Sequence, residues 1–214
     1  MKTNEERLNE LLAHLDSLDH IHVDEIPQID LYMDQVTTFM EKHLGELKRY
    51  PEDKVLTKTM INNYAKNNLL PSPVKKKYTQ EHILLLVFIY YFKNFLAIND
   101  IKDILDPVSN LFFDGNGSKK MDDIYSDIVN LILENMDSQL RDIIRKSNKS
   151  NKLYSELSDE DEKKTLSKFA FICMLSFDVW VKKTIIENLV DDTLGKKKNT
   201  VSSNSSNTKA KKNK

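Results

Sequence analysis

The sequence predicts an all-α fold, and three observations support that prediction. Apolar residues recur at spacings of three and four along most of the 214-residue chain, which is the period of one helix face. Helix-start residues, prolines and glycines stand at the ends of these runs. No segment alternates apolar and polar residues between turn signals, so we expect at most one minimal hairpin, at the prolines.

Two amphipathic helices are predicted first. Leucines at positions 8, 11, 12, 15 and 18 form a single stripe, which predicts an N-terminal helix within residues 1–23. A second stripe runs from Ile29 to Leu44, with Asp30 placed to cap its helix and Gly45 to stop it. Next, Thr57 begins a short helix that ends before Leu69-Leu70-Pro71, because proline lacks an amide donor.

An almost entirely apolar helix follows three lysines. Thr79 provides its N-terminus, His82 is interpreted as a capping residue, and the apolar run extends from Ile83 to Leu96. Because this helix is apolar on nearly every face, we expect it at the centre of the fold. A short helix should then run from Asn99 to Leu105 and end at Pro107.

Two further helices are predicted in the C-terminal half. A long helix starts near Ile124 and is interrupted by a polar gap at residues 147–151; the last begins near Ser158, whose acidic followers suit a helix N-terminus. The predicted organisation is an N-terminal helix (1–23), a central domain (24–113), a linker (114–120), a C-terminal helical region (121–194) and a disordered lysine-rich tail (195–214).

Charge is segregated along the chain although the net charge is only −1. Residues 1–34 carry two basic and nine acidic groups, whereas residues 48–78 carry eight basic and two acidic groups. Such a basic block inside a folded region is typical of a surface that binds a polyanion, although a solvated lysine-rich face has the same composition.

The helix after Thr57 has one polar and one apolar face. Asn and Thr side chains on such a face can reach base edges in the major groove, while lysines pair with phosphates. The candidate DNA-binding residues are Lys58, Thr59, Asn62, Asn63 and Lys66 on the helix, with Lys75, Lys76 and Lys77 beyond it.

The order of these parts resembles the winged helix-turn-helix of the mercury-resistance-regulator (MerR) family, in which a recognition helix ends in Gly-Leu-Leu-Pro and a basic wing leads to a Tyr-Thr helix start. Here Asn68 replaces that glycine, Asn62-Asn63 replace the usual Arg-Tyr, and the wing between Pro71 and Tyr78 is very short. More closely, the segment Ile29-Asp-Leu-Tyr-Met-Asp-Gln-Val and the run from Thr57 to Ile83 make the chain look like a family of small bacterial proteins of unknown function proposed to be transcriptional regulators. The resemblance covers roughly residues 24–106. The metal-binding cysteines of some MerR members have no counterpart.

Several other classes of function are disfavoured. The longest apolar run, ten residues from Ile83, is too short to cross a bilayer, and the N-terminus lacks a signal peptide, so we expect a cytoplasmic protein without membrane contact. Four glycines leave no phosphate-binding loop, and no nucleophile and base form a catalytic motif, so no enzyme activity or cofactor is expected. Cys173 is interpreted as a core residue. The His14, His20 and His22 group is more typical of a polar loop than of a metal site.

The sequence therefore favours a cytoplasmic regulator that binds double-stranded DNA as a homodimer. The alternative is a helical protein-interaction adaptor that presents an apolar groove near Phe169, Phe171, Phe177 and Trp180. A small-molecule effector pocket among the C-terminal helices would extend the regulator hypothesis, but a packed core is the usual role of such aromatic residues.

Overall fold

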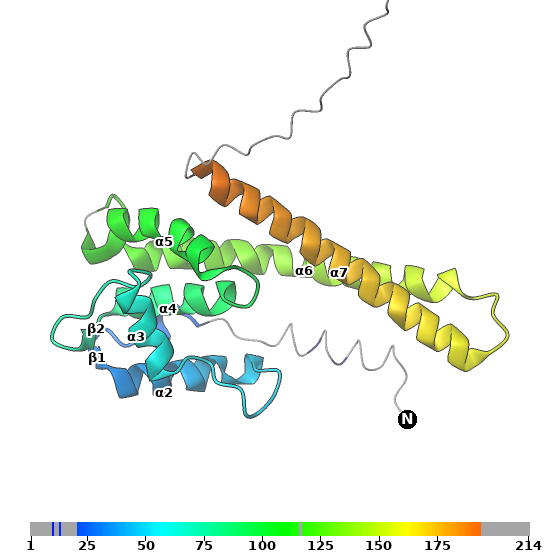
Figure 1. Cartoon of the computed structure of the whole chain (residues 1–214), viewed down its shortest axis with the longest axis horizontal. Helices are drawn as coiled ribbons and strands as arrows, with labels where there is room; N and C mark the ends of the chain where they lie inside the picture. Colours follow the sequence, from blue (N-terminus) through cyan, green and yellow to red (C-terminus); the bar gives the residue numbers. More distant parts are fainter. Residues whose placement is uncertain (1–9, 11–12, 14–20, 116, 194–214) are drawn as a thin grey trace, which may run out of the picture.

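The computed structural model describes residues 10, 13, 21–115 and 117–193 (Figure 1). Of the predicted helix within residues 1–23, the structure describes positions 10 and 13, both helical, and residues 21–23. The rest of that helix, which includes His14 and His20, lies outside the described residues, as does the tail 195–214. The described elements are η1 (Val23–Glu25), β1 (Leu31–Tyr32), α2 (Met33–Leu44), η2 (Gly45–Leu47), α3 (Lys58–Lys66), β2 (Lys77–Tyr78), α4 (Gln80–Phe92), α5 (Ile98–Phe112), η3 (Phe113–Gly115), α6 (Met121–Leu153) and α7 (Glu160–Thr193).

The prediction of a mostly helical chain is confirmed. Among the described residues there are six α-helices and one sheet of two antiparallel strands, β1 and β2. Leu31 pairs with Tyr78, and Tyr32 pairs with Lys77. None of the described helices has the length and hydrophobicity that a membrane span requires.

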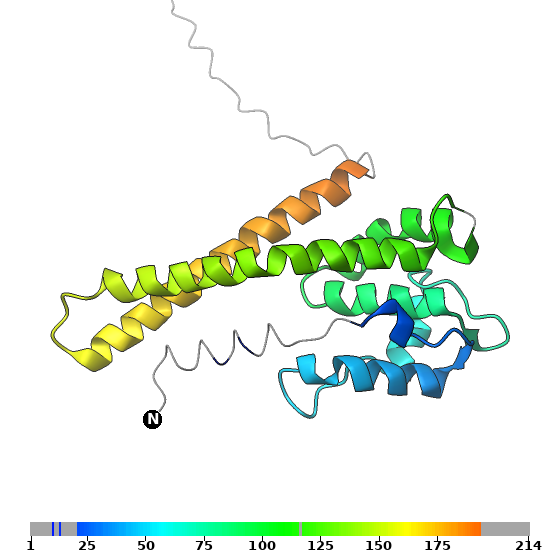
Figure 2. The same ribbon diagram turned by 180° about the vertical axis from the view of Figure 1, so that it is seen from behind.

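Helix α4 is the centre of the core, as its composition predicts. Every residue from His82 to Val87 is buried, which leaves no polar face. The amide of Thr79 donates to Nδ1 of His82 at 3.0 Å, so His82 caps the helix start as expected. Around α4 pack α2, α3, α5 and the first turns of α6 (Figures 1 and 2).

The second predicted helix begins later than expected, and Asp30 does not cap it. The backbone at Leu31 and Tyr32 forms strand β1 instead, and the amide of Tyr32 donates to the side chain of Gln35 at 2.8 Å. A two-residue strand carries no alternation that a sequence pattern could reveal. The helix ends at Leu44, before Gly45, as predicted.

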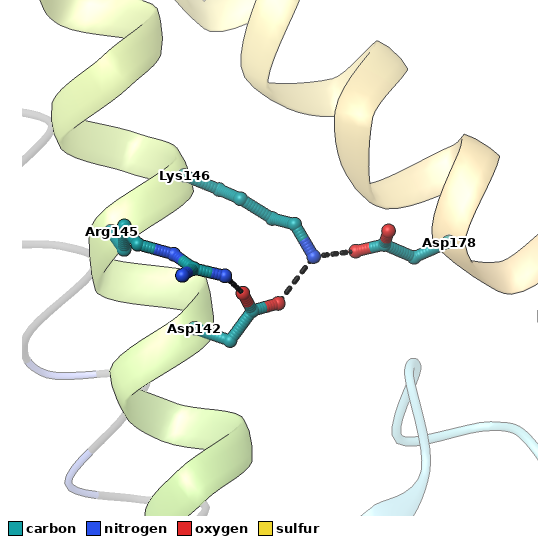
Figure 3. Close-up of polar contacts among 4 residues, drawn as sticks. All are labelled: Asp142, Arg145, Lys146 and Asp178. Carbon is teal, nitrogen blue, oxygen red and sulfur yellow. Dashed lines mark hydrogen bonds and ion pairs between the residues drawn. The ribbon is translucent and has the colours of Figure 1, made fainter.

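Two predicted helix breaks are wrong. Pro107 lies inside α5 on its exposed side, and the helix continues because Val108 and Phe112 pack against the core beyond it. The polar residues 147–151 do not interrupt α6, which continues to Leu153. Just before this segment, Lys146 bonds Asp142 of α6 and Asp178 of α7 and ties the two helices together (Figure 3).

The core also continues past the predicted linker at 114–120. Met121, Tyr125 and Val129 of α6 belong to the same buried cluster as α4, and the Tyr125 hydroxyl donates to the carbonyl of Ile21 at 2.8 Å. Burial raises the pKa of Tyr125, so it remains a neutral hydrogen-bond donor. Beyond Val129, α6 and α7 form a helical hairpin that extends away from the core (Figures 1 and 2).

The aromatic residues of α7 are not core residues, contrary to the sequence interpretation. Phe169, Phe177 and Trp180 are exposed, Phe171 is half-buried, and Cys173 is also exposed. The start of α7 is as predicted, because Asp159 accepts hydrogen bonds from the amides of Asp161 and Glu162. These bonds hold the pKa of Asp159 below its usual range.

Candidate nucleic-acid interface

Helix α3 presents its predicted polar face to solvent. Ile61 and Tyr64 are buried in the core on the opposite face, and the hydroxyl of Thr57 accepts a hydrogen bond from the amide of Met60 at 3.2 Å. This cap fixes the first turn of the helix. The structure exposes all five residues that were predicted to contact DNA from this helix, which are Lys58, Thr59, Asn62, Asn63 and Lys66.

The end of α3 is fixed by a residue in the left-handed conformation. Asn68, just after the helix, has φ 56°, a conformation that asparagine tolerates better than most residues with a Cβ. The amide of Asn68 donates to the carbonyl of Ala65 at 3.2 Å, and the amide of Leu69 donates to that of Tyr64 at 2.8 Å. These two hydrogen bonds turn the chain so that Leu69 and Leu70 enter the core.

The lysine triplet forms a tight turn. The amide of Lys77 donates to the carbonyl of Val74 at 3.0 Å, and the two residues between them, Lys75 and Lys76, have φ values of 51° and 63°. A two-residue hairpin turn with positive φ at both positions normally carries Asn-Gly or a similar pair. A residue with a Cβ loses roughly 1–2 kcal/mol in that region, so two exposed lysines are kept here at a conformational cost.

The turn and α3 meet at the start of α2. Tyr32 precedes α2 and pairs with Lys77 in the sheet, and the Lys77 ammonium lies 5.8 Å from the Tyr32 ring centroid. Asp34, in the first turn of α2, forms an ion pair with Lys58 at the start of α3. The two basic elements therefore flank one edge of the fold, although they are far apart in sequence.

Tyr32 and Asp34 are site residues that the sequence did not indicate. Tyr32 is 54% exposed, so its ring and hydroxyl are available beside the lysine turn. Asp34 partly neutralises Lys58. Strand pairing across more than forty residues places Tyr32 beside the turn, and packing of α2 on α3 brings Asp34 to Lys58; no local pattern records either.

The remaining charges leave the face basic. Within residues 21–115 and 117–193, no ion pair involves Lys66, Lys75 or Lys76. Glu41 forms an ion pair with Lys48 and also accepts a hydrogen bond from the amide of Val55 at 3.5 Å. The hydrogen bond from Lys48 holds the pKa of Glu41 below its usual range. Glu41 thereby fastens the loop before α3 to α2.

The surface has one hollow beside α3 and another elsewhere in the fold. One, of about 600 Å³, is open and lies between α2 and the start of α3, where Thr37, Lys42 and Lys54 are among its lining residues. The other, of about 380 Å³, is lined mainly by apolar side chains of α4, α5 and α7, including Phe92 and Ile186. The described residues contain no cluster of metal-ligating side chains; His22 is described, but His14 and His20 are not.

Chemically, the face combines neutral side chains that both donate and accept hydrogen bonds with fixed positive charges. That combination suits a polyanion whose surface also carries donors and acceptors.

Comparison with known proteins gives one match. Residues 21–128 match the sequence model of a family described as "Domain of unknown function (DUF1836)". This range contains α2 to α5 and ends in α6, next to Val129, the last α6 residue in the buried cluster around α4. No curated protein and no solved structure matches the chain.

Proposed function

The chain belongs to the DUF1836 family, whose function is unknown, and we propose that it is a transcriptional regulator that binds double-stranded DNA. The observation that carries this proposal is the outward face of α3 beside the lysine turn. Five polar or basic side chains lie exposed on one helix, next to two lysines held at positive φ. A surface without a ligand gains nothing from lysines at strained positions, whereas a phosphate-binding surface does.

The architecture is proposed to be a MerR-like winged helix-turn-helix. Helices α2 and α3 would be the helix pair, and the turn at residues 74–77 with strands β1 and β2 would be a minimal wing. The order that follows, a Thr79-initiated apolar helix and then α5, agrees with that arrangement. The first strand comes before α2 and anchors the wing to the recognition unit.

Each candidate residue then has a role, including the half-buried Lys77. Thr59, Asn62 and Asn63 would contact base edges in the major groove, because amides and hydroxyls match the donors and acceptors there. Lysines 58, 66 and 75–77 would contact phosphates, and Lys58 would exchange Asp34 for a phosphate oxygen. A helix of nine residues contacts few base pairs, so we propose that a homodimer reads two half-sites.

The test is a titration of labelled duplex DNA by fluorescence anisotropy at several salt concentrations. Wild-type protein should bind with an affinity that falls as salt rises, because bound lysines release counterions. Lys76→Ala should weaken binding about equally on all sequences and reduce the log–log salt slope by about 0.9. Lys149→Ala, which removes an exposed lysine from the distal part of α6, is the control and should change neither quantity. Absence of salt-dependent binding by the wild type would refute the proposal.

Base recognition is tested separately by Asn62→Ala. The wild type should select fragments from random DNA that it binds more tightly than bulk DNA. For Asn62→Ala, this ratio of affinities should fall by roughly 5–150-fold if one bidentate contact is removed. Affinity for bulk DNA should change little. An unchanged preference would show that α3 does not read the bases through Asn62.

A further inference from the structure

An exposed apolar stripe follows the outer face of α7. Phe169 and Phe177 are 63% and 62% exposed, Trp180 is 59% exposed and Ile172 is 50% exposed. The rings of Phe177 and Trp180 contact each other with centroids 5.4 Å apart and planes tilted by 34°. We call this surface the α7 stripe; it consists of Phe169, Ile172, Cys173, Ser176, Phe177 and Trp180, at helical spacings of three and four.

The stripe lies on the side of α7 that α6 does not cover. Ser167 is buried, and Ala170, Met174 and Asp178 are half-buried along the opposite side. Asp178 bonds Lys146 of α6, which fixes the rotation of α7 about its axis (Figure 3). Because successive residues of a helix are rotated by 100°, the stripe residues lie on the side of α7 opposite Asp178 and face away from α6.

The exposed area is large for a chain that acts alone. Four large side chains that are at least half exposed present roughly 100 Å² or more each, or about 400–500 Å² in total. The largest patch on a typical monomer is of that size and is often functional. A specific interface buries about 800 Å² per partner, so the stripe and its polar flanks supply the area that one interface needs.

The stripe is also self-complementary. About a midpoint between Met174 and Leu175, Phe169 corresponds to Trp180 and Ile172 to Phe177. The small residues Cys173 and Ser176 correspond to each other at the centre. If a second α7 packs antiparallel, large side chains therefore meet at both ends of the stripe and small ones meet at its middle. A two-fold interface requires this symmetry, because each contact between the two copies occurs twice.

We propose that the α7 stripe is the dimer interface, where α7 of a second copy packs antiparallel in this register. The resulting pair of hairpins forms a four-helix arrangement whose central seam is apolar. The interface depends on the surface of α7 alone and not on DNA binding. It gives a structural reason for the exposure of aromatic residues that sequence patterns assign to a core.

The first experiment measures mass and fluorescence of the full chain. Light scattering should give twice the 24.9 kDa of one chain, and emission of Trp180, the only tryptophan, should shift to the blue as concentration rises through the dimerisation range. Phe177→Glu should raise the dissociation constant at least about 100-fold, because the change enters the interface twice. Leu111→Glu is the matched control: Leu111 is similarly exposed, on α5, and its variant should remain dimeric. Circular dichroism checks that both variants stay folded.

The second experiment uses Cys173, the only cysteine, to test the register. A short bis-maleimide should link two copies through Cys173, because both residues flank the two-fold axis. With the thiol moved by Cys173→Ser and Thr165→Cys, the link should disappear, since residue 165 would lie opposite residue 184, about 28 Å from its counterpart. An equally efficient link from position 165 would overturn the antiparallel register.

Other occupants give different results. A wild-type chain that stays monomeric at all concentrations overturns the proposal. If Leu11→Glu and Leu15→Glu then shift Trp180 emission to the red in that monomer, the chain's own N-terminal segment covers the stripe. If they do not, the stripe is left for a different protein, as the adaptor hypothesis requires. Phe177→Glu should still bind duplex DNA at low salt, because the α3 face is unchanged in this variant. Failure of the dimer proposal can therefore be told apart from failure of the DNA-binding proposal.

Discussion

The helical core and the outer half of the α6–α7 hairpin differ in where their apolar side chains lie. In the core, α4 is buried on all sides, and the exposed face of α3 carries Asn, Thr and Lys. In the hairpin, Phe169, Phe177 and Trp180 lie on the outside. The core buries its central apolar side chains within one chain, and the face of α3 that it presents to solvent is polar. The hairpin leaves apolar surface uncovered, which indicates contact with another molecule.

The largest expected effect tests this contrast directly. Ile89→Ala in α4 removes a fully buried side chain and should lower the free energy of unfolding by about 2–5 kcal/mol. Phe169→Ala in α7 should lower it by less than about 0.5 kcal/mol when the interface is already disrupted by Trp180→Glu. Urea denaturation followed by circular dichroism measures both. Equal losses would mean that Phe169 is a core residue.

A smaller effect is expected between the two helices of the hairpin. Asp178→Asn removes a carboxylate from Lys146, which is only 17% exposed and keeps Asp142 as its other partner (Figure 3). We expect a loss of about 0.5–1.5 kcal/mol and faster proteolysis in the loop at residues 154–159. Asp137→Asn, which breaks an exposed ion pair with Arg141 on α6, should affect neither.

The smallest effect concerns the loop before α3. Lys48 lowers the pKa of Glu41, so the folded state binds fewer protons at Glu41 than the unfolded state does. The stabilisation by the Glu41–Lys48 pair is therefore fully present at a pH above the pKa of Glu41 in the unfolded chain, about 4.3. It is lost as the pH falls through the lowered pKa of the folded state. Wild type should lose more stability than Glu41→Gln between pH 6 and pH 3, by less than about 1 kcal/mol because Glu41 is half exposed. Parallel pH profiles would show that this ion pair is irrelevant to folding.

Local signals predicted the elements that local chemistry determines. Thr57 and Thr79 marked the starts of α3 and α4, and the spacing of apolar residues separated the two faces of α3. Pro107 misled the prediction because packing of Val108 and Phe112 outweighs one missing hydrogen bond. Strand β1 was missed because its partner lies far along the chain.

The same division applies to the site. The exposed residues of α3 could be identified from periodicity alone, since one helix determines them. Tyr32 and Asp34 could not, because only strand pairing and tertiary packing bring them to Lys77 and Lys58. The exposure of Trp180 was equally hidden, since apolar residues at helical spacing do not reveal whether the surface that covers them is in the same chain.

The proposed role of the lysine turn is tested most directly by replacing Lys75 with Asn and Lys76 with Gly in one variant. Asn-Gly suits positive φ at both positions, so we expect a free energy of unfolding that is higher by about 1–2 kcal/mol. We also expect weaker duplex binding, with a salt slope reduced by about 1.8. A more stable variant that binds DNA as tightly as wild type would contradict the account.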